Sequence, residues 1–225
     1  MKGTLVNVAA VLAGSTVGMA VGARLPERIK TMITSALGLS TLLIGMRMAF
    51  KSNNVLIVIA SMVGGGIVGE LLDLERRIEA FGEFLKAKVG SRQGSFVTGF
   101  LTASLVYCVG PMTIVGSIQE GLSGNADVLY AKAMLDGAAS VAFASSLGLG
   151  VAFSAVTVFL LQGALTLLGS QLAFLLEERI LNELTGTGGV MILGIGLLLL
   201  DVKRLRVANY LPALVIAVLL ALFFR

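Results

Sequence analysis

Apolar residues run along this chain in long stretches that short charged islands separate. Most stretches are about 18 to 22 residues long, the length that an α-helix needs to cross a hydrocarbon core of roughly 30 Å. The first stretch, after Lys2, is expected to be a retained span and not a cleaved signal peptide. The pattern predicts about eight spans, at residues 3–22, 32–49, 54–72, 96–117, 127–146, 149–170, 185–201 and 207–224.

Composition agrees with a membrane location and excludes a soluble domain. Of 225 residues, 56% are hydrophobic and 13% charged, and the mean hydropathy is +0.96. We therefore expect an all-α polytopic transmembrane bundle, with the lipid bilayer as its first partner. The chain has no histidine and a lone Cys108, so we expect no metal site, no cofactor and no internal disulfide. The net charge of +4 lies in loops, where lipid headgroups explain it without nucleic acid.

Loop charges predict the orientation. The links after spans one, three and seven hold eleven basic residues, and the opposite face holds five. By the positive-inside rule both termini face outward. The first set is Arg24, Arg28, Lys30, Arg76, Arg77, Lys86, Lys88, Arg92, Lys203, Arg204 and Arg206; the second is Lys2, Arg47, Lys51, Arg179 and Arg225.

The linker at residues 73–95 differs from the rest of the chain because apolar and charged residues alternate in it at helical spacing. Leu74, Ile78, Phe81 and Leu85 recur every three or four positions. This is typical of an amphipathic helix on the membrane surface. It either connects two parts of the bundle or binds a regulatory partner.

Two segments of the chain are alike. Leu25–Met46 and Leu176–Leu197 match at nine of 22 positions. Their spans start five apart, and because five is odd the second copy enters from the other face. We therefore predict one transmembrane domain over 1–225 with inverted repeats at 1–72 and 149–225, the linker 73–95, and a central helix pair at 96–148.

Glycines recur every four residues in two spans. Gly14, Gly18 and Gly22 share one face of the first span, and Gly65 and Gly69 repeat the spacing in the third. Such stripes let helices approach closely, either within one protomer or across a homodimer.

Span four is predicted to break in mid-membrane. Pro111 follows Gly110, removes a backbone donor and clashes with the preceding turn. The freed backbone groups must face protein or water, where they can bind an ion or polar solute; the alternative is an ordinary proline kink. The candidate site residues here are Tyr107, Cys108, Gly110, Pro111, Ser117, Gln119 and Glu120.

Span five adds charges to the same candidate site. Lys132 and Asp136 are four residues apart, the spacing at which opposite charges pair on a helix, and Ser140 lies one turn further on. Lys132 is close enough to the predicted span end to reach the surface, so Asp136 is the stronger candidate. Asn7 and Gln162 are expected to form helix-to-helix hydrogen bonds.

These motifs carry a family resemblance. CVGPMTIVGSIQEG and KAMLDGAASVAFASSLGLGV, followed by Gln162-Gly163, resemble the bacterial membrane family catalogued as domain of unknown function 554. The resemblance covers essentially the whole chain and implies a multi-span inner-membrane protein, with transport suggested. The family's motif positions are Cys108, Gly110, Pro111, Gly116, Ser117, Gln119, Gly121, Lys132, Asp136, Gly137 and Ser140.

The leading functional hypothesis is a secondary transporter or permeation protein for a small polar solute or ion, acting between spans four and five. No nucleotide-binding motif is present, so an ion gradient or a partner must supply any energy. The alternative is a non-transporting protein that binds lipid or a partner protein. Enzyme activity is not expected, because Ser117 has no histidine base and Asp136 is the lone aspartate inside a span. A homo-oligomer, such as a dimer, is expected from the glycine faces.

Overall fold

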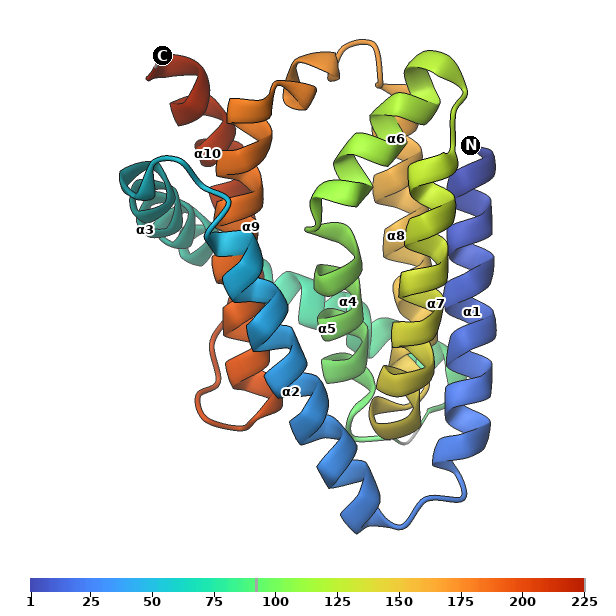
Figure 1. Ribbon diagram of the computed structural model, residues 1–225. Coiled ribbons are helices and arrows are strands. Elements are labelled where there is room, and N and C mark those ends of the chain that lie inside the picture. The colour runs from blue at the N-terminus through green and yellow to red at the C-terminus, as the bar shows by residue number, and fades with distance from the viewer. Residues whose placement is uncertain (92, 225) are drawn as a thin grey trace. The chain divides into compact units, whose positions relative to one another are not determined.

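The computed structural model describes residues 1–91 and 93–224 (Figure 1). Arg92 and Arg225, which were counted in the orientation above, lie outside these residues. Every regular element in the described part of the chain is a helix. In order these are α1 (Lys2–Gly22), α2 (Glu27–Ala49), α3 (Val55–Leu71), α4 (Leu74–Val89), α5 (Phe96–Cys108), α6 (Pro111–Ser123), α7 (Asp127–Leu147), α8 (Gly150–Leu167), η1 (Ala173–Leu176), α9 (Glu178–Leu199), η2 (Val207–Tyr210) and α10 (Leu211–Phe223).

The all-helical bundle is confirmed, but the count of eight spans is not. Within the described residues four helices are long and apolar enough to cross a membrane, namely α1, α2, α8 and α9. Two bent pairs raise the number to six: α3 with α4, at 59°, and α5 with α6, at 60°. The helix α7 falls outside this set, as it carries Lys132 and Asp136 between its apolar residues, and the segment Val207–Phe223 is shorter.

Two helices begin several residues before the spans that were predicted in them. Spans two and seven were expected to begin at residues 32 and 185, but α2 begins at Glu27 and α9 at Glu178. Each helix has an acidic residue in its first turn, where a carboxylate is favoured by the positive end of the helix dipole. Hydropathy does not detect such polar helix ends. Glu27 and Glu178 are equivalent positions in the two similar segments.

The chain divides into two compact units. Unit 1 consists of Met1–Ala36 and Glu79–Ala173, and unit 2 of Leu37–Ile78 and Phe174–Arg225. Unit 1 contains α1 and α5 to α8, whereas unit 2 contains α3, α9, η2, α10 and most of α2. Each unit thus combines helices from both predicted repeats.

In unit 1, α1 lies along α7 through its glycine stripe (Figure 1). A side chain at Gly14 or Gly18 would meet a backbone carbonyl of α7, at Gly137 or Val141 respectively. In both cases the partner residue follows its glycine by the same number of positions in the sequence. The residue numbers therefore rise together along α1 and α7, and the two helices run parallel. Gly22 repeats the contact one turn later, against the Ser145 backbone.

In unit 2, α2 crosses α9 through glycines that occupy equivalent positions of the similar segments. A side chain added at Gly45 would lie 2.9 Å from the Gly189 carbonyl, and one added at Gly196 would lie 3.1 Å from the Gly38 carbonyl. Gly38 is equivalent to Gly189, and Gly45 to Gly196. The same contact is therefore made twice with the helices exchanged, as a local two-fold axis requires.

The glycines of α3 also lie against another helix of unit 2. A side chain at Gly65 would meet the backbone of Ala213 in α10, and one at Gly69 the carbonyl of Asn209 in η2. Because the residue number rises along α3 as it falls along its partner, α3 and α10 run antiparallel.

Candidate functional site

The helix break lies at the predicted position. The helix α5 ends at Cys108, Gly110 is extended with φ −73° and ψ 150°, and Pro111 is the first residue of α6. The Thr113 amide donates to the Gly110 carbonyl at 3.1 Å, and the Thr113 hydroxyl donates to the Tyr107 carbonyl at 2.7 Å. The side chain of Thr113 therefore occupies one carbonyl that lies next to the break.

Beside the break, α7 presents a buried ion pair. The Lys132 ammonium lies 2.5 Å from Oδ2 of Asp136, and the side chains are 6% and 10% exposed. Lys132 therefore does not reach the surface. Asn7 of α1 donates from Nδ2 to the same Asp136 oxygen at 3.0 Å, which is the helix-to-helix bond predicted for it.

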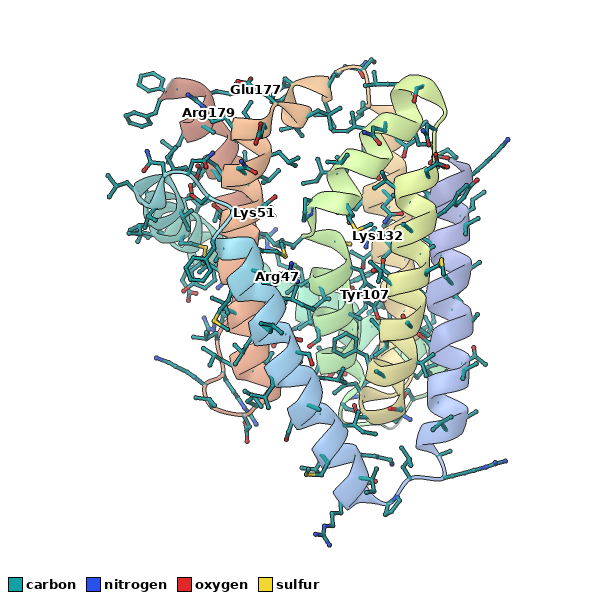
Figure 2. The ribbon with its side chains drawn as sticks, in the orientation of Figure 1. Arg47, Lys51, Tyr107, Lys132, Glu177 and Arg179 are labelled. Carbon is teal, nitrogen blue, oxygen red and sulfur yellow. The ribbon has the colours of Figure 1, made fainter. Side chains whose placement is uncertain are left out.

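Tyr107 joins this pair to α5 (Figure 2). Its hydroxyl lies 2.8 Å from Oγ of Ser140, and its ring centroid lies 5.9 Å from the Lys132 nitrogen. The tyrosine is almost wholly buried. Asn7, Tyr107, Lys132, Asp136 and Ser140 thus come from three helices of unit 1 and form one connected group, called the charged centre below.

The charged centre combines one buried cation with one buried anion. Its cation and anion are desolvated, so their pairing is strong and a change of partner has a large energetic effect. A polar solute or ion that bound to one member of the pair in place of its partner would free the charge of that partner. Such a group can bind a charged ligand reversibly inside an apolar bundle.

The other predicted site residues do not join the charged centre directly. Oε1 of Glu120 accepts from the Met1 amine at 2.9 Å and from the Gly3 amide at 2.8 Å, so Glu120 holds the start of α1. Ser117 is fully buried. The remaining residues, Cys108, Gly110, Pro111 and Gln119, are half-buried near the bend or on α6.

Two buried polar residues differ from the sequence analysis: one lacks the bond predicted for it, and the other was not singled out. Gln162 is fully buried, but neither atom of its amide has a hydrogen-bond partner, so the bond predicted for it is wrong. Glu183, which the sequence did not single out, is 1% exposed in unit 2. It accepts from the Ser52 hydroxyl at 2.5 Å and from the amides of Asn53 and Asn54 at 2.8 and 3.0 Å. A glutamate at the sixth position of a largely apolar helix was the available signal.

Apolar helices of membrane-spanning length, one broken pair and a buried charged centre define a polytopic helical membrane protein. The chain belongs to the family described as "Protein of unknown function (DUF554)", whose model matches residues 2–222. It is 29% identical over 220 residues to the "Uncharacterized membrane protein YdfK" of Bacillus subtilis (strain 168), covering 96% of this chain and 93% of the relative. It is equally similar to the "Uncharacterized protein YqgA" of Escherichia coli (strain K12), covering 96% and 94%. No solved structure matches it.

Proposed function

We propose that this protein is a secondary transporter or permeation protein for a small polar solute or ion, with its site at the charged centre. The observation that carries the proposal is the buried Lys132–Asp136 pair next to the break at Pro111. A buried pair seldom adds stability over apolar residues of the same volume, and charges inside a membrane bundle usually serve a ligand or ion path.

The paired helix contacts support an inverted repeat in this proposal. In unit 2 the α2 and α9 glycines meet in equivalent contacts made twice. Two inverted copies around a central site permit alternating access, because one part can move against the other. In this scheme the protein lies in the bacterial inner membrane with both termini outside, and it forms a homo-oligomer such as a dimer.

The proposal is tested by flux into proteoliposomes of purified protein. Stopped-flow light scattering measures osmotic re-swelling with glycerol, urea or glycine as probes, and enclosed pyranine reports proton movement. We expect flux of at least one probe above that of protein-free vesicles, and Asp136→Asn should abolish it or its pH dependence. Asp127→Asn is the matched control, because Asp127 is an exposed aspartate at the start of the same helix.

Two results overturn the assignment. The first is flux in Asp136→Asn that equals the flux in Asp127→Asn at every pH. The second is the absence of flux for every probe in the folded wild-type protein, which favours the non-transporting protein that binds lipid or a partner. A folded but inactive Tyr107→Phe variant would support the charged centre independently, because Tyr107→Phe removes just one hydroxyl.

A further inference from the structure

Buried polar atoms without hydrogen-bond partners are concentrated in one part of unit 1. Of thirteen such side-chain atoms in the described residues, eight belong to α1, α6 and α8, and all of these except Oγ of Ser15 lie within the segments 4–7, 117–120 and 162–166. Their residues are each at least nine-tenths buried. We call the six oxygens among these seven atoms the oxygen cluster: Oγ1 of Thr4, Oδ1 of Asn7, Oγ of Ser117, Oε2 of Glu120, Oε1 of Gln162 and Oγ1 of Thr166. The seventh atom, Nε2 of Gln162, is a hydrogen-bond donor of the same amide and does not bind a cation.

Contacts between the three helices bring these residues together. Glu120 of α6 binds the Gly3 amide, so it lies at the first turn of α1, where Thr4 follows. Gly163 of α8 lies against the Met1 side chain, and a side chain at Gly121 of α6 would meet the Thr166 carbonyl of α8. The first turn of α1 and the facing turns of α6 and α8 therefore meet at one place.

The register of α6 and α8 places Ser117 opposite Gln162. The segment α5–α6 runs parallel to α8, because Ser104 bonds to Thr157 and Gly121 contacts Thr166 further along. Ser117 and Gln162 each lie four residues before the second contact, which is one helical turn. Both side chains are fully buried one turn before the contact between α6 and α8.

Unpaired buried polar atoms such as these lower the stability of the fold. Each unpaired polar group in an apolar surrounding costs several kcal/mol, so a ligand or water must satisfy it. The atoms are hard oxygen donors with one carboxylate among them, a set that suits a cation of low charge. The Met1 amine takes the other oxygen of Glu120 and leaves Oε2 free.

We propose that the oxygen cluster binds a dehydrated monovalent cation, Na⁺. Hydroxyl and amide oxygens with a single carboxylate provide the donors, whereas Ca²⁺ takes six to eight oxygen ligands, several of them carboxylates. Interrupted helices of transporters coordinate Na⁺ through unwound backbone carbonyls, and here side-chain oxygens would take that part. The oxygen cluster lies beside the broken pair α5–α6.

Asn7 links this ion site to the charged centre. Its Nδ2 donates to Asp136, and this fixes the amide orientation because a carboxylate accepts and does not donate. Its Oδ1 is therefore directed away from Asp136 and is the atom without a partner. A cation at Oδ1 would strengthen the Nδ2 bond to Asp136. A role of the bound ion in coupling rests on the proposed transport function. Binding of the ion to the oxygen cluster does not depend on flux.

The test is thermal unfolding of the purified full-length protein in detergent micelles, with Na⁺, K⁺ or choline as the chloride salt at constant ionic strength. We expect Na⁺ to raise the apparent Tm in a saturable way, by more than K⁺ and with no effect of choline. Ser117→Ala and Thr4→Val should weaken the apparent Na⁺ affinity at least about tenfold, as loss of one ligand does.

Matched controls come from unit 2. Ser61 and Thr187 are fully buried and have no hydrogen-bond partner, so Ser61→Ala and Thr187→Val remove equivalent hydroxyls elsewhere and should leave the Na⁺ effect unchanged. Equal Tm values in Na⁺, K⁺ and choline would mean that the oxygen cluster holds water alone and would overturn the proposal. An undiminished Na⁺ effect in both cluster variants would overturn it too. Na⁺ binding without Asp136-dependent flux would refute the transport role and leave the ion site standing.

Discussion

The buried pair of the charged centre makes a sharp prediction about stability. Replacing one member, by Lys132→Met or Asp136→Leu, leaves the other charge buried in a protein interior. Replacing both removes the two charges together and fills the space with apolar side chains. The single variants should be far less stable than the double variant.

The expected magnitude follows from the surroundings of each ion. The side chains are 6% and 10% exposed, so water screens them little, and an unpaired buried ion costs about 3–5 kcal/mol. In Asp136→Leu the Tyr107 ring, 5.9 Å from the Lys132 nitrogen, offsets at most about 2 kcal/mol of the cost of the unpaired ammonium. The double variant should be within about 1 kcal/mol of wild type or more stable, as apolar replacements of buried pairs are.

The assay is reversible unfolding by SDS in maltoside micelles, followed by circular dichroism. The pair Glu83 and Lys86, 3.3 Å apart and more exposed, is a matched control in which each single change should cost less than about 1 kcal/mol. A Lys132→Met/Asp136→Leu variant that loses as much as the two single variants combined would refute the reasoning, because it would show that the two charges do not depend on each other.

Three further predictions concern close helix packing and the hydrogen bonds of the buried Glu183. Gly18→Ala should cost more than about 2 kcal/mol in the same assay, because the added carbon meets the Val141 carbonyl and overpacked interiors lose 1–3 kcal/mol; Gly110→Ala, whose added carbon meets nothing within 4 Å, should be nearly neutral, and equal costs would contradict the parallel packing of α1 on α7. Gly45→Ala and Gly196→Ala occupy equivalent contacts and should agree within about 1 kcal/mol; strongly unequal losses would argue against the local two-fold axis. Glu183→Gln should lower stability by about 1–3 kcal/mol by weakening bonds to the turn at residues 52–54. Glu178→Gln, which loses only the interaction with the helix dipole, should cost less than about 1 kcal/mol.

Features that depend on neighbours along the chain were predictable. The apolar stretches gave the helices, Pro111 gave the break, and the spacing of Lys132 and Asp136 gave the pair. Each follows from geometry within one helix, where residues four apart share a face. The early starts of α2 and α9 were missed because their first turns are polar.

Features that depend on which helices meet were not predictable. Asn7 bonds to Asp136 across 129 residues of sequence, and nothing local identifies that partner. The glycine stripe of α1 indicated close packing but not that α7 would cover it. The lack of a hydrogen-bond partner for the buried Gln162 amide could not be predicted either, because a buried amide in an apolar helix usually finds a partner.

The central claim is that an aqueous path opens to the charged centre, and cysteine accessibility tests it most directly. In a Cys108→Ala background, Ser140→Cys places a thiol beside Asp136 at a position that is fully buried in this structure, and Ala138→Cys places one at an exposed position of α7. A membrane-impermeant cationic thiol reagent is applied to proteoliposomes. The account predicts that Ser140→Cys reacts, because the path admits water during the transport cycle. It predicts that Ala138→Cys does not, because the side of α7 that it shares with the exposed Met134 is expected to face lipid. An unreactive Ser140→Cys, while Asp127→Cys at the exposed start of α7 reacts normally, would contradict it.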